Sequence, residues 1–502
     1  MSDYAFPFDL EAALREAFGD WLIPSSLTIH DGAAYWLEGH PDGSQQVGLL
    51  SADPAQLDQF QGEAVPFRDG FLVKHAAATE GSARALRNAL PWLKPVPLGL
   101  ATSFGFGDRL GLATPGHVQA IQAIREQYPD ADIWPVFAQQ STRELGRTRR
   151  KWGEVMTAAS FGAFEAGWQA GLGADAHRLR SPEDLNAALN AGFTTFTLDT
   201  NDHVDTAAEL DDLKTIAFKL MRIDWETLNR TQADIEREYL NKEIDTGFMV
   251  IRFDRELIVR TIVKLGNAIT HIVRMVRHLQ ESGQPFEIAI AVDESERPLR
   301  HAEHVFLARE LIRLNVDWVG IAPRFVGTFE KAIEYKGDLR HLERDLRGHA
   351  AIAQTYGPYK LRLQSGSDKF ELYSLLADVS EGLLHVATSG TSYLEALRVV
   401  AAAHPDLMRE IGALVRGRYG YDRRAYIVSG QVDQMPPMAS LTDDQLPTLL
   451  DHPNTRQILH VTYGSVLDAF GDDLLETLRR HHADYTEGLR SHFVRHLSAL
   501  LD

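Results

Sequence analysis

The 502-residue sequence contains no cysteine. Disulfide bonds, thiolate catalysis and cysteine-bound zinc are therefore excluded. The sequence also lacks any apolar run near the roughly 18 residues that a membrane-spanning helix needs. Its first stretch, MSDYAFPFDLEAALREAFGDW, is interrupted by acids too early to be a signal peptide. We therefore expect a cytoplasmic protein with no membrane partner.

The chain has no excess of basic residues either. It carries 70 acidic residues against 51 lysines and arginines, which gives a formal net charge of −19. Nucleic-acid binding needs a basic surface, so we expect no nucleic-acid partner. The expected partner is a small molecule, and the composition leaves open whether the chain forms a homo-oligomer. The length suits one large domain with additions, or two or three domains.

Several common catalytic signatures are missing. The sequence has no GxSxG, Walker A or HExxH motif. The stretch GFGDRLG at 105–111 resembles a dinucleotide-binding loop, but its third glycine comes one position too late for GxGxxG. A Rossmann-type cofactor site is therefore not indicated.

From residue 98 onward, short apolar runs alternate with helical patterns. Such alternation predicts βα units and a parallel sheet. We predict eight strands, at 98–102, 132–137, 168–174, 193–199, 287–293, 317–322, 360–364 and 383–388. Helices are predicted between them, at 117–128, 152–166, 181–191, 255–279, 301–314, 339–356 and 369–376.

Eight strands match an α/β fold of the (β/α)8, TIM-like barrel type. We expect an N-terminal α+β extension at 1–97 and a catalytic barrel at 98–400, interrupted by a helical insertion at about 205–285. A C-terminal helical extension at 401–502 completes the prediction. Insertions in such barrels often cover the catalytic end. An open, doubly wound sheet is the alternative.

Polar side chains gather where the predicted strands end. The clearest case is TTFTLDTNDHV at 194–204, where a β-branched run ends in acids and a histidine. Buried groups of this kind must be hydrogen-bonded, metal-bound or catalytic. Because barrel enzymes place their chemistry at the carboxyl ends of the strands, we expect these ends to converge on one site.

Strand periodicity suggests which side chains face the barrel axis. Successive strand residues point to opposite faces, which turns Asp293, Gln364 and His385 inward. With His203 they form a predicted metal site. Imidazole combined with oxygen ligands suits Zn, Mn, Ni, Co or Fe rather than Ca. The alternative is that each histidine is a hydrogen-bonded core residue.

Asp202 and Glu294 are the predicted acid/base pair, because carboxylates beside a cation can have pKa values tuned for proton transfer. The alternative is ordinary ion pairing with Arg324 or Lys369. The loops SGSDK (365–369) and SGTSY (389–393) offer backbone N–H groups to a carboxylate or phosphate, although they also read as plain turns. The predicted substrate-binding residues are Arg109, His177, Arg324, Ser367, Asp368 and Lys369.

Eight segments between about residues 100 and 400 together resemble the tagaturonate epimerase family. They are FGFGDRLGLATPGH (104–117), QQSTRELGRT (139–148), GADAH (173–177), TLDTNDHV (197–204), VDESE (292–296), APRFVGTFEK (322–331), GPYKLRLQSGSDKF (357–370) and HVATSGTSYLEALR (385–398).

The resemblance implies a metal-dependent barrel enzyme that interconverts D-tagaturonate and D-fructuronate. Related proteins act as ketohexose 4-epimerases, which extends the expected substrates to D-tagatose and D-fructose. By resemblance, Asp202 is a proton acceptor beside the metal ligand His203, and the acids of VDESE include a proton donor. The chain departs from the family pattern at Gln364, where histidine is expected, and at Arg178, where lysine is expected.

The carbon inverted by such an epimerase is β to the ketone, so its C–H bond is not acidified and enolisation cannot invert it. Retro-aldol cleavage followed by re-addition to the other aldehyde face is the favoured route. Transient oxidation by a bound NAD is the second. Two other functions remain open on the residues alone. One is a barrel glycoside hydrolase using Asp202 and Glu294, and the other is a non-enzymatic sugar-acid binding protein.

Overall fold

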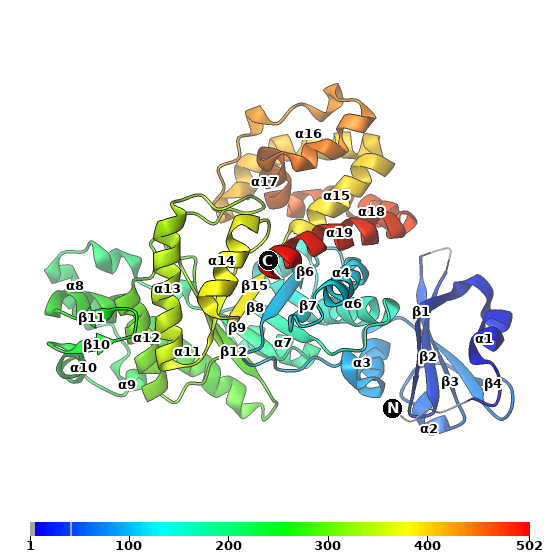
Figure 1. Cartoon of the computed structure of the whole chain (residues 1–502), viewed down its shortest axis with the longest axis horizontal. Coiled ribbons are helices and arrows are strands. Elements are labelled where there is room, and N and C mark those ends of the chain that lie inside the picture. The colour runs from blue at the N-terminus through cyan, green and yellow to red at the C-terminus, as the bar shows by residue number, and fades with distance from the viewer. Residues whose placement is uncertain (1–5, 41–42, 502) are drawn as a thin grey trace.

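A computed structural model describes residues 6–40 and 43–501 of the chain. At its centre, eight parallel strands close into a barrel in the order β12-β13-β14-β15-β6-β7-β8-β9 (Figure 1). Their bounds are β6 Ser103–Gly107, β7 Trp134–Ser141, β8 Gly173–Leu179, β9 Thr195–Asp199, β12 Glu287–Val292, β13 Gly320–Pro323, β14 Lys360–Leu363 and β15 Leu384–Ala387. The predicted (β/α)8 barrel is confirmed, and the open-sheet alternative is wrong.

Two strands begin about five residues later than predicted. The prediction at 98–102 was wrong because SFGFG, the true β6, reads as a turn: glycine disfavours strands. The barrel requires these glycines, however. A Cβ on Gly105 would lie 1.6 Å from Oε1 of Gln139, and one on Gly107 would lie 2.6 Å from the Cα of Ser389. Similarly, 168–174 was predicted where β8 occupies 173–179, so Asp175 and His177 lie within a strand and not after it.

Helices surround the barrel close to the predicted positions. They are α4 Thr114–Gln127, α5 Thr142–Thr148, α6 Trp152–Glu165, α7 Pro182–Ala191, α11 Arg255–Glu281, α12 His301–Arg313, α13 Leu339–Tyr356, α14 Phe370–Ser380 and α15 Thr391–Ala403. The sequence SPED at 181–184 caps α7: the Ser181 hydroxyl accepts a hydrogen bond from the Asp184 N–H.

The N-terminal region forms a separate small layer beside the barrel (Figure 1). Helix α1 (Leu10–Phe18) packs on a five-stranded antiparallel sheet in the order β1-β2-β3-β5-β4. The strands are β1 Leu22–His30, β2 Ala33–Gly39, β3 Gln45–Ser51, β4 Ala64–Pro66 and β5 Leu72–Ala77, with helices α2 Pro54–Leu57 and α3 Glu80–Ala89. Asp31 and Gly32, which favour tight turns, connect β1 to β2 as an antiparallel hairpin.

Two further regions are added to the barrel. The insertion after β9 contains α8 Leu213–Leu220, α9 Trp225–Leu228, α10 Gln232–Tyr239 and the hairpin β10 Glu243–Asp245 with β11 Val250–Arg252. It extends from the side of the barrel opposite the N-terminal sheet (Figure 1).

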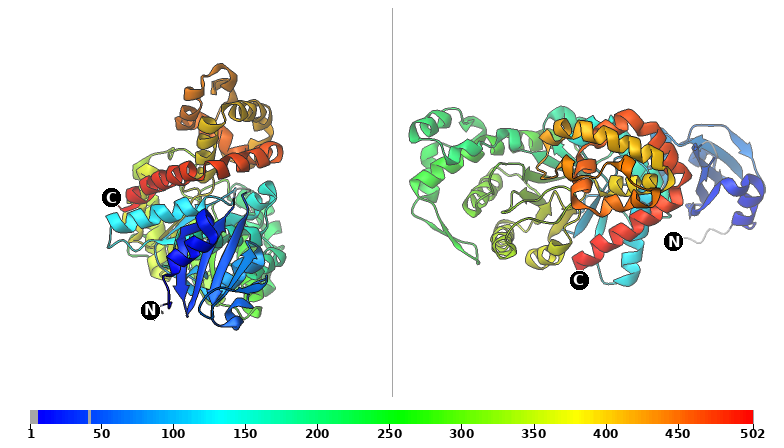
Figure 2. Two further views of the ribbon diagram at one scale, coloured as in Figure 1. Left: turned by 90° about the vertical axis from the view of Figure 1, so that its right-hand side faces the viewer. Right: turned by 90° about the horizontal axis from the view of Figure 1, so that it is seen from above.

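The C-terminal extension contains α16 Pro405–Asp422, α17 Pro453–Val461, α18 Tyr463–Arg480 and α19 His482–Leu501. Seen from above, it lies across the barrel, and α19 packs against α4 and α14 (Figure 2). Within the part of the chain that the structure describes, no helix is both long and apolar enough to cross a bilayer.

Candidate functional site

A cavity of about 290 Å³ opens at the carboxyl ends of the barrel strands. Its barrel wall comes from the carboxyl ends of β8, β13 and β14, from α5 and from the loops after β12, β13 and β14, and its outer wall comes from Arg424–Ile427 of the C-terminal extension. A smaller cavity of about 40 Å³ lies beside it, and the two share lining residues: Arg143, Arg178, Lys331, Gln364 and Tyr426. The two cavities therefore form one continuous candidate site.

The larger cavity is strongly basic although the protein as a whole is acidic. Six basic side chains line it against two carboxylates, Asp293 and Glu294. The basic residues are Arg143, Arg178, Arg324, Lys331, Arg362 and Arg424. Such a surplus of positive charge attracts an anion, and arginine is suited to two-point binding of a carboxylate.

The two acids of the cavity are held by two arginines. Arg178 contacts Asp293 at 2.8 Å and Glu294 at 3.3 Å, and Arg143 contacts Glu294 at 2.7 Å. Burial raises the pKa of Glu294, but the two guanidinium groups outweigh burial and lower it to about 2. Glu294 is therefore a carboxylate at neutral pH. One oxygen of Asp293, Oδ1, has no hydrogen-bond partner among the described residues and is available to a ligand.

Arg324 and Lys331 are the two basic groups on the barrel side of the cavity that make no ion pair with any described residue. Arg324 makes no ion pair with any described residue, its Nε has no hydrogen-bond partner, and burial lowers its pKa. Lys331 Nζ lies 2.8 Å from the Ser365 hydroxyl. Burial, together with repulsion from Arg178 and Arg143, lowers the pKa of Lys331 to about 8. Both side chains are consequently free to bind an anion or, for Lys331, to exchange a proton.

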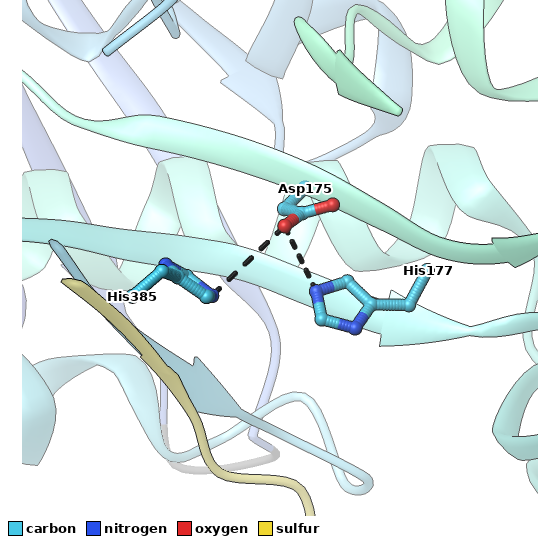
Figure 3. Close-up of side chains that lie close together, drawn as sticks. All are labelled: Asp175, His177 and His385. Atoms are coloured by element: carbon cyan, nitrogen blue, oxygen red, sulfur yellow. Dashed lines mark ion pairs between the residues drawn. The ribbon is translucent and has the colours of Figure 1, made fainter. Parts of the chain in front are cut away.

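Below the cavity, Asp175, His177 and His385 meet inside the barrel (Figure 3). Their ligand atoms all lie within 4.8 Å of one another. Asp175 Oδ2 lies 2.9 Å from Nε2 of His177 and 4.0 Å from Nε2 of His385. Arg362, on β14 at the opposite wall from β8, also pairs with Asp175 across the barrel. Burial raises the pKa of Asp175, but Arg362 and the two histidines reverse this and hold it well below its usual range.

The donor set of this cluster fits a divalent transition-metal ion. Gln364 Oε1 accepts a hydrogen bond from Nδ1 of His177 at 2.9 Å, so Nε2 is the ring nitrogen that faces the Asp175 carboxylate. A lone pair and an anion at this distance repel unless a proton or a cation lies between them. Nε2 of His385 is also buried without a hydrogen-bond partner among the described residues. One carboxylate with two imidazoles is a donor set that zinc and its neighbours accept.

The structure brings together most of the residues predicted from the sequence. Asp293, Glu294, Gln364 and Arg324 line the larger cavity, and Arg109 and His177 line the smaller one. His385 lies at the Asp175 cluster. Arg109 is buried in an ion pair with Glu144 at 3.0 Å, with its guanidinium 3.7 Å from the ring centre of Tyr463.

Two predicted residues, Asp202 and His203, line neither cavity. Both are exposed. Asp202 pairs with Arg180 at 3.0 Å, and the ring of His203 stacks on His271 with a centroid distance of 4.1 Å. The strand-end acid Asp199 is also occupied, by Arg180 at 2.7 Å. The acids at the polar end of TTFTLDTNDHV therefore form ion pairs with Arg180, and none of the candidate metal-binding groups among the described residues includes His203, so its joint metal site with His385 stays a prediction.

The SGSDK loop supports the fold more than the cavity. Lys369 is fully buried and donates to the backbone carbonyls of Glu330, Ile333 and Ser367. Asp368 pairs with Arg456 at 2.9 Å, and Ser367 Oγ accepts from the Ser389 N–H at 3.4 Å. None of the three loop residues Ser367, Asp368 and Lys369 lines either cavity.

Sequence reasoning missed several residues of the site. The strand predicted at 168–174 ends one residue before Asp175, which therefore falls in a predicted loop although it lies within β8, and no pattern in the sequence assigns a role to Arg362. Arg424 and Tyr426 belong to the C-terminal extension, where no strand-end pattern points to them. Lys331 is the last residue of the APRFVGTFEK segment (322–331), and no local pattern marks it as a site residue.

The comparisons with known proteins agree with one another. A family model described as UxaE, tagaturonate epimerase, matches residues 42–500. A tagaturonate/fructuronate epimerase of Thermotoga maritima is 39% identical over 472 residues, covering 94% of this chain and 95% of that protein. The glycerol-complexed and native crystal structures of the fructuronate-tagaturonate epimerase UxaE of Cohnella laeviribosi each match with a TM-score of 0.88 at 32% identity, covering 98% of both chains.

Proposed function

The chain belongs to the tagaturonate epimerase family and is an epimerase, and on this basis we propose that it interconverts D-tagaturonate and D-fructuronate by retro-aldol cleavage and re-addition. The inverted carbon is β to the ketone, so inversion requires breaking a C–C bond or removing a hydride. The family comparisons support an epimerase, and they support neither the glycoside hydrolase nor the sugar-acid binding protein.

The observation that carries the choice of substrate is the basic lining of the cavity. A hexuronate differs from a neutral ketohexose by one carboxylate, and the cavity presents six basic groups against two acids. Arg324 and Arg424 both lack an ion-pair partner among the described residues, and Arg324 is the better candidate to bind that carboxylate because it is half-buried whereas Arg424 is exposed. We expect D-fructuronate to be strongly preferred over D-fructose.

Asp175, His177 and His385 are the residues that would hold a divalent metal ion. When bound, such an ion would act as a Lewis acid that stabilises negative charge on the oxygens of the ketone. Gln364 orients the His177 ring through its Nδ1 hydrogen bond, as outer-shell partners of metal-binding histidines do.

Glu294 is the proposed group that takes and returns the proton of the substrate hydroxyl. It faces the cavity as a carboxylate, and the same proton must be removed before cleavage and restored after re-addition. A substrate carboxylate that competes for Arg143 or Arg178 would loosen their hold on Glu294 and make it a stronger base. Asp293 and the protonated Lys331 lie on the same cavity wall and would orient the hydroxyl groups. The role of Asp202 as proton acceptor stays a prediction.

Cleavage produces two three-carbon fragments, and the fragment with the carboxylate also carries the aldehyde that must turn over. Arginines can hold this carboxylate while the aldehyde rotates about the neighbouring bond. The outer wall formed by Arg424–Ile427 would retain both fragments until they rejoin.

The first experiment incubates chelator-treated protein with D-fructuronate and with D-fructose, with and without Mn²⁺, Ni²⁺ or Zn²⁺, and separates the products by chromatography. Metal-restored D-tagaturonate supports the function and the cofactor together. Equal activity before and after chelation would contradict the proposed metal dependence. Absence of product with every metal tested would contradict the proposed epimerisation.

An isotope experiment separates the two mechanisms. D-Fructuronate carrying deuterium at the inverted carbon keeps that C–D bond during retro-aldol chemistry, so no primary isotope effect is expected. Transient oxidation breaks the bond and should slow the reaction several-fold. A primary isotope effect would therefore exclude retro-aldol cleavage.

A further inference from the structure

A second group of histidines lies outside the barrel, between α12 and α13. His301 and His304 come from α12, and Asp345 and His349 from α13. None of these residues lines the basic cavity. Three of them, His301, Asp345 and His349, place one ligand atom each within 4.8 Å of the others.

His349 is the most telling member of this group. Its side chain is completely buried, and its Nε2 has no hydrogen-bond partner among the described residues. That nitrogen lies 3.7 Å from Oδ1 of Asp345, which in turn is 3.4 Å from Nε2 of His301. A buried imidazole nitrogen without a partner is costly and rare, so its direction towards a carboxylate and a second imidazole points to a ligand between them.

A chain of hydrogen bonds fixes the other side of the His349 ring. Nδ1 of His349 lies 2.9 Å from Nδ1 of His304, and Nε2 of His304 lies 2.8 Å from the hydroxyl of Tyr359. If Nδ1 of His349 donates to Nδ1 of His304, Nε2 of the neutral His349 ring carries a lone pair. This is the arrangement in which a metal-binding histidine is oriented by an outer-shell partner.

The backbone also accommodates the cluster. A Cβ on Gly348 would lie 2.4 Å from Nε2 of His301, so a larger residue here would push this ring away from its present position against α13. In the structure Nε2 of His301 is 3.0 Å from the carbonyl of Asp345, and a metal ion would take the place of that hydrogen bond.

We propose that His301, Asp345 and His349 form a second metal site, which binds Zn²⁺ or a similar divalent transition-metal ion. One carboxylate and two imidazoles supply three ligands, and the partial exposure of His301 leaves access for water as a fourth. A structural role follows, because the ion would join α12 to α13.

A third group, Asp368 with His492 and His496, does not make the same case. Nε2 of His496 accepts from the Asp368 N–H at 3.1 Å, and Nε2 of His492 is 2.5 Å from the Thr391 hydroxyl. Arg456 already neutralises Asp368 at 2.9 Å. Its histidine nitrogens are thus used by the protein itself.

The second site is connected to the basic cavity. Asp345 Oδ2 accepts from the Val326 N–H at 3.0 Å, and the carbonyl of Arg324 accepts from the Leu299 N–H at 2.8 Å. An ion bound by Asp345 would therefore stiffen the loop that carries Arg324. This consequence for binding rests on the proposed function, whereas the metal site itself does not.

The test is metal stoichiometry, measured by elemental analysis of the full chain after Zn²⁺ loading and desalting. We expect about two ions per chain in the wild type and about one in His349→Gln. His385→Gln should lose the ion bound in the barrel and keep the ion of the second site. The double variant His349→Gln/His385→Gln should therefore retain no ion. His301→Gln is the milder second variant, since its side chain is partly exposed, and circular dichroism checks the fold of each.

The outcomes separate the two sites. If His349→Gln and His301→Gln bind as much zinc as the wild type, the second site does not exist. If the wild type holds one ion that His349→Gln loses and His385→Gln keeps, the second site is supported. The same result would contradict a metal ion at the barrel cluster Asp175, His177 and His385. Zinc should also raise the melting temperature of His385→Gln but not that of the double variant.

Discussion

Two of the barrel's additions, the insertion after β9 and the C-terminal extension, differ in one respect: only the extension reaches the candidate site. The C-terminal extension supplies Arg424–Ile427 to the cavity wall, whereas no residue of the insertion at 205–285 lines either cavity. The insertion nevertheless follows the carboxyl end of β9, which is where barrel enzymes usually place active-site loops. Position in the sequence is therefore a poor guide to which addition covers a barrel site.

Packing explains the difference. Helix α19 lies against α4 and α14, so the extension is brought back across the barrel (Figure 2). Glu330, the neighbour of Lys331, then binds the extension directly, with Oε2 accepting from the Ser429 N–H at 2.9 Å and from Gln457 at 2.6 Å. The insertion instead turns outward and leaves Leu213 and Met221 exposed.

On the proposed function, the barrel carries the chemistry and most of the binding, the extension closes the cavity and the insertion does neither, and Glu294→Gln is the strongest test of this contrast. Glutamine keeps the shape but cannot take the hydroxyl proton, so kcat should fall by about 10²–10⁴-fold with a smaller change in KM. Steady-state kinetics with D-fructuronate measures both. Asp202→Asn, on the exposed rim, is the matched control and should keep most activity. The reverse result would move the proton acceptor to Asp202.

The two arginines on opposite walls give the next effect. Arg324→Met removes a charge-assisted contact from a half-buried site and should raise KM for D-fructuronate by about 10–100-fold. Arg424→Met acts on an exposed side chain, so about 2–5-fold is expected. Neither should change KM for D-fructose. An effect at Arg424 equal to that at Arg324 would show that the extension binds the carboxylate as strongly as the barrel does.

The pH profile tests Lys331, which lies where the barrel wall meets the extension. Its pKa is lowered to about 8 by burial and by Arg178 and Arg143, so the charged form dominates at pH 7 and disappears as the pH rises through 8. If the ammonium group binds substrate, kcat/KM should fall about tenfold per pH unit above that value. Lys331→Arg keeps its charge and should lose this alkaline decline. If the decline of kcat/KM above pH 8 is the same in Lys331→Arg as in the wild type, Lys331 is not the group whose titration causes it.

The parts of this site that were predictable from sequence are those set by strand periodicity. Alternation turned Asp293, Gln364 and His385 inward, and all three lie at or just below the cavity. The barrel itself followed from the alternation of strands and helices. Alternation does not determine where a strand begins. Because β8 is predicted five residues too early, Asp175 falls outside the predicted strand, and its pairing with His177 is not predicted. Arg424 and Tyr426 depend on how distant helices pack, and no local pattern encodes that.

The smallest expected effect belongs to the insertion, and it tests whether this addition is catalytically silent. Met221→Ser and Leu213→Ser change side chains that are 73% and 67% exposed, so stability should change by no more than about 0.5 kcal/mol. Because neither residue touches the cavity, kcat and KM should stay within about twofold of the wild type. Kinetics and thermal melts on both variants measure this. A larger loss of activity without a loss of stability would place the insertion in the catalytic cycle and end the contrast between the two additions.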